Sequence, residues 1–295
     1  MESDLPRKLE FGISINPSWS EQEEMLALVR LAESGGLDLV GVQDHPYQWR
    51  FYDTWTLISY LGGATSSIRF FPDVAALPLR PPAMLAKSVA SLDVLTGGRV
   101  ELGLGAGAFW EAIGAMGGEV RSRAEAVAAI EEAIDVIRLV WSGERGVRYQ
   151  GRHYRLSGLH TGPEPVHDIG IWVGARGPRM LDLIGRKGDG WVPSASWAPV
   201  EELPPYLRRI EEAASRAGRD AGSIRRIYNV GGSIRDQSDG RFVGPPEQWV
   251  EDLTAAVEAG MDIFIFWPEG EGRARQVERF ASEVVPEVRA AFGDR

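Results

Sequence analysis

Short apolar runs and amphipathic runs alternate along this chain, and the alternation repeats eight times. Short apolar runs are typical of buried parallel strands, and an apolar face repeating every 3.6 residues is typical of a helix. A helical pattern follows every strand candidate. This order predicts an α/β fold, a (β/α)8 TIM barrel, which typically takes about 250 residues. The strand candidates are residues 9–15, 37–42, 68–75, 99–104, 169–173, 190–193, 224–230 and 261–267.

Local signals mark the helix ends. Ser20 with Glu23, and Ser122 with Glu125, have the spacing of a capping box, in which each side chain satisfies a backbone N–H group of the other residue. Pro286 lies inside the last helical pattern and is expected to kink that helix, because proline has no backbone N–H to donate.

The chain is longer than a minimal barrel, and two insertions account for the excess. One is the glycine-rich segment 105–121, after the fourth strand. The other is 143–168, where VRYQGRHYRL has the pattern of a small hairpin. Strands and helices alternate too regularly for two separate domains. We therefore expect one domain over residues 1–295.

Composition excludes several classes of protein. Hydrophobic residues make up 44% and charged residues 25%, which is ordinary for a globular chain. The absence of cysteine excludes disulfides, thiol catalysis and sulfur-ligated metals. A net charge of −10 without a Lys/Arg cluster argues against a nucleic-acid partner. No apolar run is long enough for a membrane helix, and the start MESDLPRKLE does not have the pattern of a signal peptide. These features favour a cytoplasmic protein with no membrane partner.

Barrel enzymes carry their sites at the carboxyl ends of the strands, and Asp44-His45 follows the second strand. A histidine there can take or give a proton near neutral pH, and Asp44 can fix its tautomer. The alternative is a turn-forming Asp44 before Pro46, with His45 as a solvated loop residue. Position alone leaves both interpretations open.

A glycine-rich segment follows the fourth strand. Gly103, Gly105 and Ala108 match the dinucleotide pattern G-x-G-x-x-A. That pattern needs a helix opening at its second glycine, on the first strand of the fold, and neither condition holds here. A backbone that passes close to a flat ligand explains the glycines better. A tight turn without a ligand is the alternative.

Two further segments have a functional and a plainer interpretation. Residues 174–177, with Arg176, precede a helix that opens at Pro178, which is typical of an anion site at a helix start. An ordinary turn with solvated arginines is the alternative. Asp73, taken alone, indicates only a strand that ends early at Pro72. The histidines of the second insertion lack metal-ligand spacing and are expected on the surface: His153, His160 and His167.

Three motifs, in this order, resemble the luciferase-like monooxygenase family of flavin- and deazaflavin-dependent oxidoreductases. They are QDHPYQW, LDVLTGGRVELGLGAG and IWVGARGPRMLDLIGRKGDGWVPS. The resemblance extends over about residues 9–196. It implies a luciferase-like TIM barrel that binds FMN or coenzyme F420 across its carboxyl-terminal mouth, and a homodimer, since relatives are often dimers.

The resemblance also implies roles for single residues. A non-proline cis peptide at Asp73–Val74 would support the cofactor ring from behind, residues 106 and 107 would contact the ring and its ribityl chain, and residues 174–177 would hold its phosphate. The cofactor-binding residues implied in this way are Asp73, Val74, Ala106, Gly107, Gly174, Ala175, Arg176 and Gly177.

In the deazaflavin branch of the family, an Asp-His pair is followed by a tryptophan four residues after the histidine, as in Asp44, His45 and Trp49. The resemblance implies that His45 moves a proton and that Trp49 walls the substrate. The sugar-phosphate dehydrogenases of this branch carry an acidic residue where this chain has Ala108. We therefore expect hydride transfer between F420 and another small organic substrate.

Two other functions remain open. One is an FMN-dependent monooxygenase that uses O2 and receives FMNH2 from a partner reductase. The other is a flavin-binding protein without turnover on the same barrel.

Overall fold

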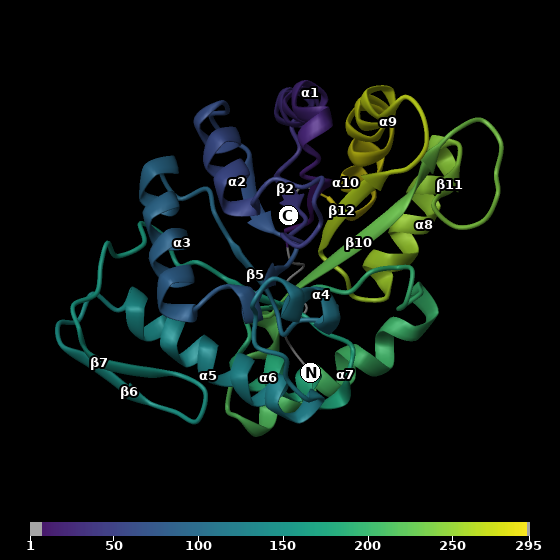
Figure 1. Cartoon of the computed structure of the whole chain (residues 1–295). Coiled ribbons are helices and arrows are strands. Elements are labelled where there is room, and N and C mark those ends of the chain that lie inside the picture. Colours follow the sequence, from purple (N-terminus) through teal and green to yellow (C-terminus); the bar gives the residue numbers. More distant parts are fainter. Residues whose placement is uncertain (1–7, 294–295) are drawn as a thin grey trace.

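The computed structural model describes residues 8–293, so the polar start of the chain at residues 1–7 lies outside the described residues. Parallel strands form a barrel in the order β3-β2-β1-β12-β10-β9-β8-β5-β4 (Figure 1). Phe70 closes the ring against the start of β5, through bonds of 2.9 Å to the backbone of Arg99 and Glu101. The predicted barrel is confirmed. Its strands are β1 (Glu10–Ile15), β2 (Leu39–Val42), β3 (Arg69–Pro72), β5 (Leu102–Gly105), β8 (Ile171–Gly174), β9 (Gly190–Trp191), β10 (Arg225–Ile234) and β12 (Ile263–Pro268).

Helices surround the barrel as an outer layer (Figure 1). They are α1 (Gln22–Ser34), α2 (Thr54–Gly63), α3 (Pro82–Thr96), α5 (Arg123–Trp141), α6 (Pro178–Lys187), α7 (Leu203–Arg216), α8 (Pro246–Glu258), α9 (Arg273–Arg279) and α10 (Val285–Phe292). A short helix, α4 (Trp110–Ala115), follows β5 and lies inside this ring in the view of Figure 1. A π-helical turn, Phe280–Val284, separates α9 from α10 next to Pro286. The last helix is therefore interrupted where the sequence predicted a kink.

The third strand differs from its prediction. Residues 68–75 were expected to form one strand, but β3 ends at Pro72 and a short strand, β4 (Ala75–Ala76), follows a turn. β3 pairs with β2, whereas β4 pairs with β5 on the other side. The two residues of the turn, Asp73 and Val74, are joined by a cis peptide bond, as the resemblance implied.

The insertions and helix starts also differ in part. The second insertion contains the predicted hairpin, formed by β6 (Val147–Gln150) and β7 (Arg155–Leu159). The first contains α4, which the sequence analysis did not predict. The capping box at Ser122 is confirmed. The one at Ser20 is wrong, because α1 begins at Gln22 and the Ser20 hydroxyl bonds the Ser18 hydroxyl instead, at 3.0 Å.

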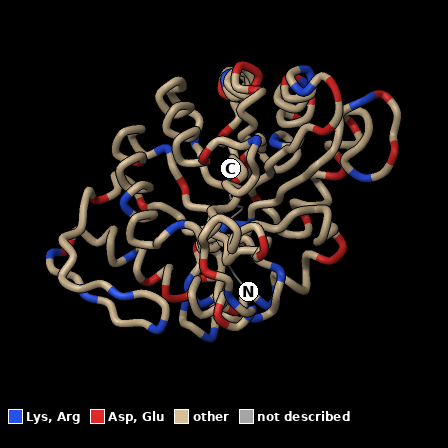
Figure 2. Tube along the Cα trace, in the orientation of Figure 1, with Lys and Arg blue, Asp and Glu red and all other residues tan. Residues whose placement is uncertain are grey.

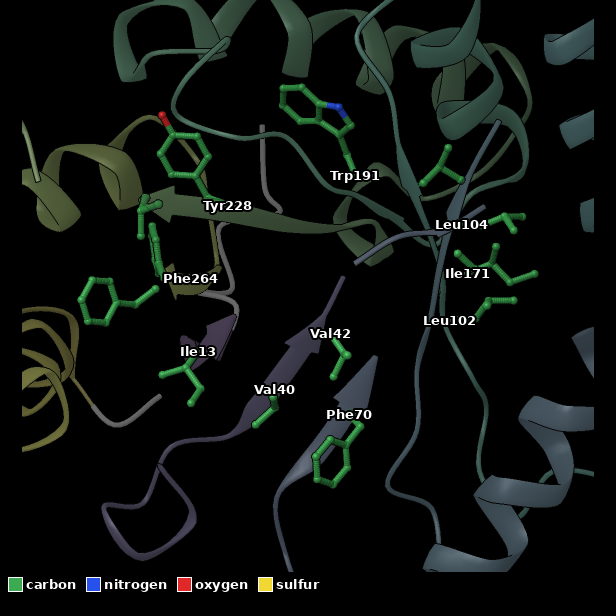
Figure 3. Close-up of a cluster of buried hydrophobic side chains, with 14 of the residues drawn as sticks. Ile13, Val40, Val42, Phe70, Leu102, Leu104, Ile171, Trp191, Tyr228 and Phe264 are labelled. Carbon is green, nitrogen blue, oxygen red and sulfur yellow. The ribbon is translucent and has the colours of Figure 1, made fainter. Parts of the chain in front are cut away.

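Two apolar clusters account for the interior. The larger lies between the barrel and its helices, and Figure 3 shows its side chains on successive strands, among them Ile13, Val42, Phe70 and Trp191. The smaller includes Phe71, Trp172 and Ile265, which lie on the opposite face of their strands. A barrel filled by side chains is a packed core and leaves its mouth as the place for a site.

β10 continues past the predicted end at residue 230, and the remaining strand, β11 (Val243–Gly244), pairs in parallel with its last residues, Ser233 and Ile234. Acidic and basic residues are interspersed around the barrel (Figure 2). Among residues 8–293, no helix combines the length and the apolar character needed to cross a membrane.

Candidate active site

The loop after β2 is fixed to the neighbouring strand by one buried carboxylate. Asp44 accepts two bonds from the Arg80 guanidinium, at 2.6 and 2.7 Å, and a third from the backbone N–H of Ala76, at 2.9 Å. Arg80 precedes α3, and Ala76 belongs to β4. A carboxylate with this many charge-assisted bonds acts as an anchor. Asp44 therefore holds the end of β2 over β4.

His45 follows this anchor and is half-buried. Its Nδ1 lies 2.6 Å from the Tyr47 hydroxyl, and the Phe109 ring meets it edge to face at 5.5 Å between centroids. Burial lowers the pKa of His45, and nearby Asp44 opposes that shift only in part. The imidazole is therefore neutral at pH 7. The expectation that Asp44 fixes the tautomer of His45 is wrong. Arg80 and the Ala76 N–H group bond the Asp44 carboxylate, and the Tyr47 hydroxyl bonds the His45 ring nitrogen.

Asp73 lies in the turn between β3 and β4 and faces the barrel axis. The Asn229 amide, from β10 across the barrel, donates a bond of 3.0 Å to its carboxyl. Burial raises the pKa of Asp73 to about 6, against the smaller opposing effect of Asn229. The Asn229 Oδ1 atom is buried and has no hydrogen-bond partner among residues 8–293. The Asn229 amide and the titratable Asp73 carboxyl group thus lie together at the barrel mouth.

Glycines around this centre make room for the Val74 side chain. A Cβ atom on Gly105 would lie 2.8 Å from a methyl of Val74, and one on Gly174 would lie 2.9 Å from it. A Cβ atom on Gly103 would lie 3.0 Å from a methyl of Val74, and closer still to the Pro72 carbonyl oxygen. Larger residues at these places would displace Val74. The glycines therefore bring β5 and β8 close around one apolar side chain at the barrel mouth.

The loop after β5 contains Ala106 and Gly107 and ends in Phe109. Gly107 has a φ of +98°, in the region that favours glycine, and a Cβ there would lie 2.8 Å from Pro78. Both features require a residue without a side chain. Phe109 is 59% exposed, so it borders the mouth next to His45.

The loop after β8 leads into α6 without a side-chain cap. Gly177 is the N-cap residue, and no side chain bonds the first N–H groups of the helix. Ala175 is held by its carbonyl, which accepts a bond of 2.9 Å from the Trp191 indole. The Arg176 guanidinium is exposed and lies 5.6 Å from the Trp197 ring centroid. A helix start without a side-chain cap, beside an arginine, is suited to an anion.

Trp49 lies in the same loop as His45 and is 72% exposed. The Arg50 guanidinium lies 4.7 Å from its ring centroid. Its role as a substrate wall therefore stays a prediction.

The sequence model of the luciferase-like monooxygenase family matches residues 11–241. The chain belongs to the luciferase-like monooxygenase family. It is an oxidoreductase of the luciferase-like type, and its parallel barrel agrees with the fold that this family implies.

Named relatives of this luciferase-like enzyme include dehydrogenases. An F420-dependent glucose-6-phosphate dehydrogenase from Nocardia farcinica is 25% identical over 96% of this chain and 98% of the relative. An F420-dependent hydroxymycolic acid dehydrogenase from Mycobacterium tuberculosis is 32% identical over 72% of this chain and 59% of its own length. A solved F420-dependent secondary alcohol dehydrogenase, bound to an F420-acetone adduct, shares the fold with a TM-score of 0.86 at 20% identity, over 96% of this chain and all of that one.

Sequence analysis missed three residues of the luciferase-like site. Tyr47 is within the quoted motif QDHPYQW, and its spacing of two residues from His45 was the available signal. Arg80 is an arginine next to a helix start, in a loop that ends at the barrel mouth. Asn229 ends a predicted strand, but nothing in the sequence pairs it with Asp73.

Proposed function

We propose that this luciferase-like oxidoreductase binds coenzyme F420 and transfers a hydride between its deazaflavin ring and a small organic substrate. The relatives that match most of this chain carry F420 dependence in their names. The spacing of Asp44, His45 and Trp49 is the one that the deazaflavin branch uses. Bound F420 would supply the hydride chemistry, and the protein would supply orientation, proton handling and exclusion of water.

The residues of the mouth fit a flat cofactor with a charged tail. Val74 and the glycines around it offer an apolar surface against which a planar ring can lie. The unpartnered Asn229 Oδ1 is an acceptor at the same place. The uncapped start of α6, with Arg176 beside it, suits a phosphate. We assign the ring to Asp73, Val74, Ala106 and Gly107, and the phosphate to residues 174–177.

The observation that carries the proposal is the position of His45. Its neutral imidazole stands at the end of β2, next to the turn that holds Val74, because Asp44 binds to β4. A group that exchanges protons near neutral pH is what hydride transfer to or from an oxygen- or nitrogen-bearing carbon requires. Trp49 and Phe109 would enclose the substrate beside it.

The substrate we propose is uncharged. Ala108 occupies the place of the acidic residue in the sugar-phosphate dehydrogenases, and Glu111 lies on α4, out of register with that place. The residues that border His45 are aromatic, among them Tyr47 and Phe109. An apolar rim with few charges favours small ketones, imines, alkenes or alcohols.

The test is a titration of the purified protein with F420 and, separately, with FMN, followed by fluorescence. Micromolar or tighter binding of F420 with weak FMN binding is the expected result. Tight binding of FMN with weak F420 binding would overturn the proposal. It would support the monooxygenase alternative, with O2 as co-substrate and a partner reductase as the source of FMNH2. An Arg176→Ala variant, predicted to weaken F420 binding about tenfold, checks the phosphate position.

A further inference from the structure

His45 and Tyr47 form a pair that the established properties of the chain do not explain. We infer that the Tyr47 hydroxyl donates to Nδ1 of His45 and so keeps the ring proton on Nε2, which makes His45 a hydrogen-bond donor toward the substrate. This rests on the proposed function for the identity of the hydride donor. It deepens that function by specifying the substrate class, a carbonyl-type acceptor.

The first step of the argument is which partner donates in the 2.6 Å contact. Burial raises the pKa of Tyr47 to about 12, with Asp44 adding to the rise, so the phenol keeps its proton at neutral pH. His45 is neutral and carries a single ring proton. A phenol is a better donor than an imidazole N–H, and an imidazole nitrogen is a better acceptor than a phenol oxygen. The Tyr47 hydroxyl therefore donates, and Nδ1 accepts.

The second step is that no competing acceptor holds the proton on Nδ1. A carboxylate beside a histidine normally accepts Nδ1–H and leaves Nε2 as a base. Asp44 is the adjacent carboxylate, but Arg80 and the Ala76 N–H group engage both its oxygens. Within residues 8–293, Tyr47 is the only hydrogen-bond partner of the His45 ring.

The third step is that the pair is held as a unit. The rings of His45 and Tyr47 both contact Phe109, at centroid distances of 5.5 and 6.0 Å. Phe109 belongs to the loop after β5, whereas the pair belongs to the loop after β2. Contact across two loops limits rotation of both rings. The Nε2–H group consequently has a fixed direction.

A donor at this place stabilises negative charge that develops on a substrate oxygen. In the reduction, bound reduced F420 would supply a hydride to the carbonyl carbon, and the electron pair of the C=O π bond would move to oxygen. That oxygen accepts the hydrogen bond from Nε2–H and takes one proton, which solvent supplies. The substrate gains two electrons and the reduced cofactor loses two.

The decisive experiment measures the tautomer without any cofactor. The chain has four histidines, so nitrogen-15 spectra of histidine-labelled protein are simple to assign. In the wild type we expect a protonated Nε2 and an unprotonated Nδ1 for His45. Tyr47→Phe should convert this to a mixture of tautomers. Tyr52→Phe is the matched control, because Tyr52 is in the same loop but its hydroxyl bonds Gln22, at 3.0 Å. A proton on Nδ1 in the wild type would overturn the inference.

Kinetics give an independent readout. With F420 and a panel of ketones, Tyr47→Phe should lower kcat by at least about tenfold and change its pH profile, because a mixed tautomer leaves the developing charge unbonded part of the time. Tyr52→Phe should leave both unchanged. If the wild-type tautomer is as expected but F420 does not bind, the proposed function fails and the assignment of Tyr47 stands. If F420 supports turnover and Tyr47→Phe reduces ketones at the wild-type rate and pH profile, the inference fails alone.

Discussion

Buried titratable groups have different partners at the two ends of the barrel. At the amino-terminal end, Glu10 meets Arg69 at 2.7 Å and Arg225 at 3.3 Å, and Arg69 also meets Glu101 at 3.2 Å. Burial raises the pKa of Glu10, but these arginines more than offset it, so the pKa lies below its ordinary value. Each charge there has an opposite charge beside it.

At the mouth, Asp44 is paired with Arg80, but Asp73 and His45 have only neutral hydrogen-bond partners. Asp73 bonds an amide, and His45 contacts a phenol. Burial therefore decides the direction of both pKa shifts: it raises the pKa of Asp73 to about 6 and lowers the pKa of His45 below its ordinary value. Buried groups that titrate near neutral pH cost stability and are typical of active sites. The comparison teaches that one end of this barrel stabilises the fold and the other end is available for proton chemistry.

The largest effect that tests this division is on activity. His45→Ala should lower kcat by about 10²- to 10⁴-fold, the usual contribution of a positioned acid or base. F420 affinity should change by no more than a few-fold, and the free energy of unfolding by less than about 1 kcal/mol. Steady-state kinetics, F420 titration and urea unfolding check the three quantities. His160→Ala, at an exposed position in the second insertion, is the control. Activity within a few-fold of wild type would remove His45 from the mechanism.

The next effect is on stability at the opposite end. Glu10→Gln removes the charge that Arg69 and Arg225 share, and should lower the free energy of unfolding by about 2 kcal/mol at pH 7. Because the pKa of Glu10 is lowered by folding, its contribution is present above the ordinary value of 4.5 and is lost as pH falls through the folded value. The difference between the two proteins should therefore shrink in acid. Glu283→Gln, in an exposed pair with Arg279, is the control and should change little. A Glu10→Gln variant that lost activity at unchanged stability would contradict the assignment of the amino-terminal end to stability.

The smallest expected effect is a gain in stability. Asp73→Asn makes the same acid-to-amide change at the mouth and should raise the free energy of unfolding by about 1 kcal/mol at pH 8. Folding raises the pKa of Asp73, so the wild type loses stability as pH rises from about 4 to about 6, and the variant does not. The advantage of the variant should therefore shrink as the pH falls from 8 toward 4. Urea unfolding at both pH values measures this, and destabilisation at pH 8 would show that the carboxylate is compensated.

Some features of the molecule followed from sequence because they are local. The eight strands have apolar runs, and the positions of His45 and Gly107 follow from strand ends in a barrel. Features made by distant partners did not follow. Asn229 meets Asp73 across 156 residues of chain. His167 was expected on the surface. Instead, its Nδ1 atom lies 2.7 Å from the carboxylate of Asp93, which belongs to α3, and its Nε2 atom lies 3.6 Å from that of Glu101. Helix α4 was missed because glycine and alanine crowd its segment and no capping residue precedes it.

The loop between β2 and α2 is tied at both ends by one side chain. Arg80 bonds Asp44 at its start and Asp53 at its finish, at 2.6 and 2.7 Å. Thr54 adds a bond of 2.5 Å from its hydroxyl to the Gln43 carbonyl, which closes the base of the loop.

This closure has an evolutionary consequence. Residues 48–51 can be exchanged while the attachment of the loop, and with it the location of His45 and Tyr47, is inherited unchanged. Descendants of such a protein can acquire new substrates by altering these four positions alone. The clamp thus separates the part of the loop that must be preserved from the part that is free to diversify.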